Sequence, residues 1–182
     1  MADPIDRLQD LLDKQDIREC LARFSRGMDR FDRDIYLSAF HEDAEMAAGP
    51  YVGSVAGCWD WAVPMHEQGQ ILTHHSLLNN TLDIDGDVAH SETYYMFVAR
   101  NRDESVVLAG GRYIDRVERR DGVWKIALRT NIIEWSCLPP AIPPPFADIP
   151  DIAVNGVSSR STDDPSYMRP LVNRREPSDP SQ

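Results

Sequence analysis

Asp29 and His75 are the two residues of this chain whose types and positions best suit chemistry. Asp29 lies near the end of an expected N-terminal helix, and His75 lies on a strand expected later in the chain. A carboxylate that meets an imidazole fixes its tautomer and stabilises its protonated form, which leaves the other ring nitrogen free to take a proton from a substrate. We therefore predict an Asp–His general base inside one small domain.

His74 and His75 are adjacent, so on a strand they must point to opposite faces. We expect His75 to face a pocket and His74 to face away from it. A lone strand histidine or a carboxylate at a helix end is often purely structural, and for each of the two dyad residues that alternative stays open. No histidines and carboxylates stand at metal-ligand spacing, so we expect no metal site.

The first half of the chain reads as helices. Asp3-Pro4 has the form of a helix N-cap followed by proline at the first helical position, and apolar residues then recur at helical spacing as far as Met28. Asp29 lies about 100° from Met28 on a helical wheel, at the border of the buried face. We also expect a short helix at 33–40, a short strand at 44–48 and a third helix at 54–68 that is interrupted at Pro64.

The second half reads as an antiparallel meander with strands at 72–84, 89–101, 105–118 and 123–135. Asp85-Gly86-Asp87 and Arg120-Asp121-Gly122 are hairpin signals. Helices followed by a long meander favour an α+β domain, with the helices packed on one face of a curved sheet.

The last 45 residues differ in composition, because ten of the 13 prolines fall between Pro139 and Pro180. We predict a domain over residues 1–137 and a Pro-rich C-terminal arm or tail over 138–182. Apolar residues such as Ile142 and Phe146 exceed what a solvated tail needs. We expect an arm, as far as about Tyr167, that crosses to a neighbouring subunit or covers the pocket mouth.

Composition narrows the class of partner. The chain has 182 residues, 30 acidic against 19 basic, and a formal charge of −11, which disfavours nucleic-acid binding and suits a small organic substrate. No apolar run approaches the roughly 18 residues needed to span a bilayer, and the first residues are acidic where a secretory signal would be basic. Three sparse cysteines suit reduced thiols, so we expect a cytoplasmic protein without membrane contact.

Several of these residues together resemble a known family. The order of elements, Asp29, the stretch His75-Ser-Leu-Leu-Asn79, Asp85-Gly86-Asp87 and the segment from Gly110 to Lys125 are similar to the SnoaL-like branch of the nuclear transport factor 2 superfold. The pattern resembles lindane dehydrochlorinase and the scytalone and bile-acid dehydratase group. The resemblance covers roughly residues 5–137.

The resemblance implies a fold, a site and an assembly. The fold is a cone-shaped barrel, a strongly curved antiparallel or mixed sheet wrapped around N-terminal helices, with a deep apolar pocket at its open end. Asp29 would orient His75 as the general base, and Arg129 would stabilise the leaving group. The relatives work without a cofactor and commonly form trimers, so a homotrimer is expected here.

Five further residues are candidates for the wall of the substrate pocket. The chain lacks a tyrosine beside Asp29, and Tyr51 is the best substitute as a hydroxyl donor. Strict alternation along the last strand groups Arg129 with Lys125 and Asn131, and sets them on the face opposite Trp124, Ile126, Leu128 and Ile132. For the aromatic residues, plain core packing is the alternative. The candidates for the pocket wall are Tyr51, Trp59, Trp61, Tyr95 and Asn131.

These observations predict a cofactor-independent lyase for a hydrophobic cyclic or aromatic small molecule, with loss of water as the expected reaction. Loss of halide needs the same base and pocket, as do a retro-aldol carbon–carbon cleavage, an isomerisation and a cyclisation. A non-catalytic ligand-binding module is the alternative from another class, because one fold hosts many functions.

Overall fold

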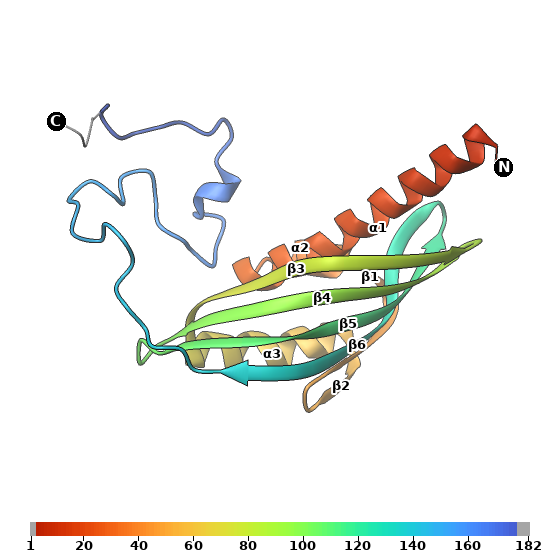
Figure 1. Ribbon diagram of the computed structural model, residues 1–182, viewed down its shortest axis with the longest axis horizontal. Coiled ribbons are helices and arrows are strands. Elements are labelled where there is room, and N and C mark those ends of the chain that lie inside the picture. The colour runs from red at the N-terminus through yellow and green to blue at the C-terminus, as the bar shows by residue number, and fades with distance from the viewer. Residues whose placement is uncertain (1–2, 178–182) are drawn as a thin grey trace.

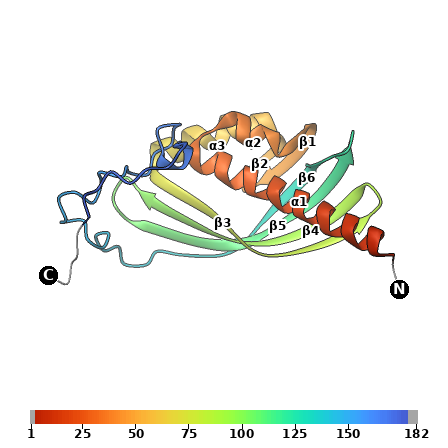
Figure 2. The same cartoon turned by 90° about the horizontal axis from the view of Figure 1, so that it is seen from above.

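The computed structural model describes residues 3–177 and shows an α+β domain. Three helices lie on one side of a six-stranded sheet that curves around them (Figures 1 and 2). The predicted fold class is therefore confirmed. The elements follow in the order α1 (Pro4–Arg30), α2 (Arg33–Ser38), β1 (Phe40–Ala48), β2 (Tyr51–Ser54), α3 (Val55–Gly69), β3 (Gln70–Asp85), β4 (Val88–Asn101), β5 (Val106–Arg120) and β6 (Val123–Cys137).

The sheet is mixed, with strand order β2-β1-β6-β5-β4-β3. Strands β3 to β6 form the predicted antiparallel meander, and β1 adds to β6 in parallel. The sheet has two edges, β2 and β3, so the expected barrel exists as curvature and does not close.

Helix α1 begins as its sequence predicts. The Asp3 carboxylate accepts a hydrogen bond from the Ile5 amide, and Pro4 occupies the first turn, where no amide donor is needed. The helix buries one apolar face against the sheet, formed by Ile17, Cys20, Leu21, Phe24 and Met28. No helix within residues 3–177 combines the length and the apolar character that crossing a bilayer requires.

The turn after α1 depends on Gly27. A methyl group on Gly27 would collide with the backbone of Tyr36 in α2, so only glycine permits this close approach. Phe31 then takes a left-handed conformation, with φ of 52°, and ends the helix. Asp29 thus lies in the last turn of a helix whose end is fixed by packing.

Two sequence expectations in the first half were wrong in detail. Helix α3 runs through Pro64 without interruption. The proline removes one amide donor, but Trp59 and Ala62 are buried in the core and hold the helix in place. Strand β1 begins at Phe40 rather than at residue 44, and the short strand β2 was not predicted.

A β-bulge in β6 overturns the expected grouping of its side chains. Arg116 pairs with Leu128 and Val117 pairs with Ile126, so Ala127 is an extra residue on β6. Because a bulge shifts the alternation by one residue, Trp124 and Ile126 share the helix-facing side with Arg129 and Asn131. The prediction that these two pairs lie on opposite faces was wrong.

Beyond Cys137, the described chain forms turns and one 3-10 helix, Pro165–Tyr167. The Tyr167 hydroxyl donates to the Asp32 carboxylate at 2.6 Å, and the Arg160 guanidinium donates to the carbonyls of His66 and Gln70. The segment therefore returns to the α1–α2 turn (Figure 1), and Arg160 ties it to the end of α3. Its crossing to another subunit stays a prediction.

Candidate active site

Asp29 and His75 meet where the last turn of α1 faces β3. Nδ1 of His75 lies 2.6 Å from Oδ1 of Asp29, and the backbone amide of His75 donates to Oδ2 at 2.9 Å. The Thr73 hydroxyl donates to Oδ1, also at 2.9 Å. Because Asp29 occupies Nδ1, Nε2 of His75 is the nitrogen that can take a proton from a ligand.

The electrostatics of the pair suit a carboxylate that stays ionised. Burial raises the pKa of the Asp29 carboxyl, but the hydrogen bonds and charge of His75, together with the Thr73 hydroxyl, more than offset burial and hold the pKa below its ordinary value. The neighbouring His74 is exposed on the other face of β3. The two adjacent histidines therefore have different surroundings.

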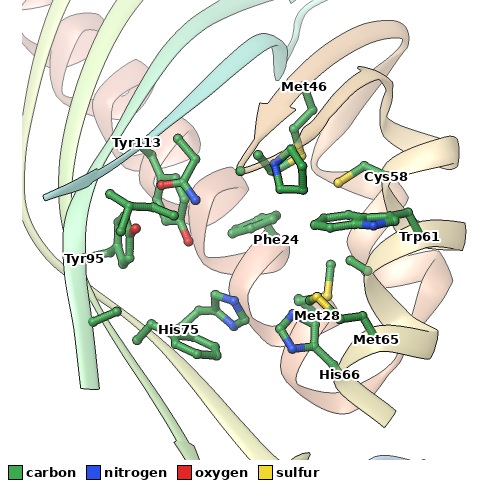
Figure 3. Close-up of a pocket in the computed structure, with 18 residues that line it drawn as sticks. Phe24, Met28, Met46, Cys58, Trp61, Met65, His66, His75, Tyr95 and Tyr113 are labelled. Atoms are coloured by element: carbon green, nitrogen blue, oxygen red, sulfur yellow. The ribbon is translucent and has the colours of Figure 1, made fainter. Parts of the chain in front are cut away.

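His75 lies on the wall of a cavity of about 250 Å³ between α1, α3 and the sheet. Figure 3 shows His75, His66, Phe24 and Trp61 around a common space. Most of the wall is apolar, and polar groups are few, as is typical of small-molecule sites. The lining residues include Phe24, Met28, Met46, Cys58, Trp61, Met65, His66, Tyr95, Phe97, Tyr113, Asn131 and Ile133.

Tyr95, Tyr113 and Asn131 form a polar section of this wall on β4, β5 and β6. The rings of Tyr95 and Tyr113 stack with centroids 4.4 Å apart. Burial raises the pKa of both phenols, so both stay protonated and can donate hydrogen bonds. Oδ1 of Asn131 is buried without a hydrogen-bond partner in residues 3–177, which makes it available to a ligand donor.

Arg129 is fully buried but does not line the cavity. Its guanidinium makes two hydrogen bonds to Asp115, at 2.7 and 2.8 Å, and it packs over the rings of Phe24 and Tyr113, 4.2 and 4.3 Å from their centroids. The expected direct contact between Arg129 and a leaving group does not fit this placement, because the two rings cover the guanidinium on the cavity side.

Comparison with known proteins gives the family. The SnoaL-like domain family matches residues 9–130, about two thirds of the chain. The chain belongs to the SnoaL-like family. A search of the curated proteins found no match.

Solved structures with the same fold resemble this SnoaL-like domain at low sequence identity. A hexachlorocyclohexane dehydrochlorinase, LinA type 2, is 20% identical with a TM-score of 0.70, and the match covers 77% of this chain and 99% of that one. LinA type 3 from Novosphingobium barchaimii LL02 is 18% identical with a TM-score of 0.68, covering 76% and 99%. A protein described as a scytalone dehydratase from Novosphingobium aromaticivorans is 19% identical with a TM-score of 0.63, covering 70% and 88%.

Two residues expected to bind substrate lie elsewhere in the SnoaL-like domain. The Tyr51 hydroxyl donates to the Ser54 carbonyl at 2.8 Å, and the ring stacks on Trp61, so Tyr51 lies behind the cavity wall. Trp59 packs against Tyr36 in the core. Trp61, Tyr95 and Asn131 line the cavity as expected.

His66 is a cavity residue that the sequence analysis missed. It lies on α3, with its ring centroid 6.0 Å from that of His75 and the two rings nearly perpendicular. Its position, four residues after Ala62 and eight after Cys58, continues the inward-facing stripe of this helix, and that spacing was the available signal.

Proposed function

We propose that this protein is a cofactor-independent lyase for a hydrophobic cyclic or aromatic small molecule, with His75 as the general base and Asp29 as the residue that orients it. The observation that carries the proposal is the 2.6 Å contact between Asp29 and Nδ1 of His75 on the wall of an apolar cavity. A module that only binds ligands has no need of a carboxylate that fixes an imidazole tautomer.

The proposed reaction is an elimination of water. Nε2 of His75 removes a proton from a carbon next to the one that bears a hydroxyl group, and the electron pair left behind forms the carbon–carbon double bond as the carbon–oxygen bond breaks. The imidazolium, stabilised by ionised Asp29, then returns its proton to the departing oxygen, which leaves as water. The base is neutral again at the end of the cycle, so no other reactant is required.

Arg129 acts on this reaction through Tyr113 in our proposal. A cation above a phenol ring makes its hydroxyl a stronger hydrogen-bond donor, and Arg129 lies 4.3 Å from the Tyr113 ring centroid. Tyr113 lines the cavity and takes the donor role that the sequence suggested for Tyr51. Arg129 is thus a positioning residue, and Tyr113 is the group that meets developing negative charge.

We also propose that the protein forms a homotrimer and is located in the cytoplasm, as the sequence suggests. Exposed apolar side chains on the outer side of the sheet, including Tyr94, Met96 and Trp135, offer a surface for a homotrimer. The three cysteines, all in the described part of the chain, are free, as suits a reducing cytoplasm.

The function is tested by screening cyclic alcohols, halides and hydroxyketones against the full-length protein in deuterated water, with mass spectrometry as the readout. We expect one class to lose water, and we expect Asp29→Asn and His75→Ala to abolish that loss. His74→Ala is the matched control, because it removes a histidine from the same strand on the exposed face.

Loss of halide or of a carbonyl fragment in place of water would support the Asp29–His75 dyad but show that the reaction is not a dehydration. A rearranged product of unchanged mass would indicate an isomerase or cyclase. Saturable ligand binding without any change of mass or uptake of deuterium would support the binding module and contradict the lyase.

A further inference from the structure

His66 is a second imidazole on the cavity wall, and the Asp29–His75 pair does not account for it. It enters from the last turns of α3, while His75 enters from β3 (Figure 3). Their ring centroids are 6.0 Å apart, and Phe97 packs against both rings. A ligand that reaches His75 therefore lies within reach of His66.

Gln70 fixes the tautomer of His66. Gln70 is the C-cap of α3, four residues after His66, and its Oε1 lies within hydrogen-bonding distance of Nδ1 of the imidazole. An amide oxygen only accepts hydrogen bonds, so Nδ1 carries the proton and Nε2 has a free lone pair. This orientation makes His66 an acceptor in the cavity.

Burial keeps His66 neutral. It lowers the pKa of the imidazole, and the positive charge of Arg160 acts in the same direction, as does a proton on His75 once His75 has taken it up. The bond to Gln70 and the more distant carboxylate of Asp29 oppose them without reversing the shift. A neutral ring with a protonated Nδ1 offers its lone pair at neutral pH and no proton.

We propose that His66 is a specificity-determining residue that accepts a hydrogen bond from a hydroxyl group of the substrate, next to the position that His75 deprotonates. This inference rests on the proposed function and narrows its substrate class to neutral cyclic alcohols and phenols. A halogen or an ether oxygen at this place has no proton to give, and it would leave the Nε2 lone pair unpaired in an apolar cavity.

The tautomer is tested by nitrogen-15 NMR of the histidine side chains in the wild type and in Gln70→Met. We expect the signals of His66 to show a protonated Nδ1 in the wild type and a shift towards the Nε2-protonated form in Gln70→Met. A wild-type His66 with its proton on Nε2 would overturn the proposal, because that nitrogen would then be a donor.

The acceptor role is tested by calorimetric titration with 2-naphthol and 2-fluoronaphthalene, which have similar shapes and differ in the hydroxyl. We expect the affinity ratio in favour of the naphthol to fall about tenfold in His66→Phe, the scale of one hydrogen bond. His74→Phe is the matched control, because it replaces a histidine on the exposed face of β3, outside the cavity, and should keep the ratio.

An unchanged ratio in His66→Phe, or an equal loss of the ratio in His74→Phe, would contradict the assignment. Neither measurement uses turnover, so both separate this inference from the lyase activity itself. Asp29→Asn should keep the preference for the naphthol even though it is expected to be inactive.

Discussion

Two carboxylates on the inner side of this domain, Asp29 and Asp115, each pair with a basic side chain, and the two pairs differ in what lies beside them. Asp29 binds His75 on the wall of the cavity. Asp115 binds Arg129 a short way along the inner face of the sheet, where the rings of Phe24 and Tyr113 cover the guanidinium. The side chains of the first pair are 14% and 9% exposed, and those of the second are fully buried.

This difference separates a pair that can do chemistry from a pair that stabilises the fold. A histidine can take up and release a proton, and the cavity gives a ligand access to His75. An arginine keeps its proton, and a sealed arginine touches no ligand. In our proposal, similar carboxylate pairings therefore serve two purposes, catalysis where the cavity gives access to the pair and stability where it does not.

The largest expected effect concerns the fully buried pair of Asp115 and Arg129. Asp115→Asn leaves the Arg129 charge buried without a counter-charge, so we expect the free energy of unfolding to fall by about 3–5 kcal/mol. Asp29→Asn should cost less, because Asp29 and His75 retain partial access to solvent. Urea denaturation of both variants measures the loss in the free energy of unfolding in each. Equal losses in the two variants would show that the distinction between the pairs is wrong.

Replacing both Asp115 and Arg129 tests the same difference between the two pairs. Asp115→Leu combined with Arg129→Met removes the buried charges together, so we expect most of the stability to return. Turnover should still fall about tenfold, because Tyr113 loses the cation above its ring, while binding of an uncharged substrate analogue stays near normal. Full turnover in a stable double variant would rule out a contribution of Arg129 to the reaction.

The pH dependence of the free energy of unfolding tests the Asp29–His75 pair. The folded-state pKa of Asp29 lies below its ordinary value of 3.8, so its ionised form contributes stability that is present above pH 3.8. That contribution is lost as the pH falls through the lowered folded pKa. We expect the stability difference between the wild type and Asp29→Asn, measured in urea, to shrink below pH 3.8. A difference that stays constant from pH 7 to pH 3 would argue against an ionised Asp29.

The smallest effect should come from the C-terminal segment. Tyr167→Phe removes the hydrogen bond to Asp32 and should lower the free energy of unfolding by about 1 kcal/mol, measured by urea denaturation.

Ending the chain before Pro139 tests the predicted arm, with light scattering reporting the mass of the assembly. We expect a smaller assembly or lower turnover. An unchanged trimer with unchanged turnover would show that the segment is dispensable.

The sequence predicts those features that depend on local chemistry. The cap at Asp3, the helical stripe of α1 and the hairpins at Gly86 and Gly122 are set by neighbouring residues, and each appears as expected. The positions of Asp29 and His75 follow from the ends and faces of these elements, and the structure brings the two side chains together.

The errors arise where distant segments decide the outcome. The bulge at Ala127 depends on how β6 pairs with β5, and a single strand read alone does not reveal it. Which side chains of α3 meet the cavity depends on the rotation of the helix against the sheet. Of the two tryptophans expected there, Trp61 lines the cavity and Trp59 does not, and His66 lines it without having been expected. Arg129 has its partner, Asp115, on the neighbouring strand, and no local pattern links the two.

The role of His75 as the general base is measured by the turnover of His75→Ala with and without added imidazole. We expect turnover to fall at least about 10²-fold. We also expect partial recovery with imidazole, because the vacated space beside Asp29 has the shape and the hydrogen-bond acceptor for that ring. Turnover within a few-fold of the wild type in His75→Ala, with no response to imidazole, would contradict that role.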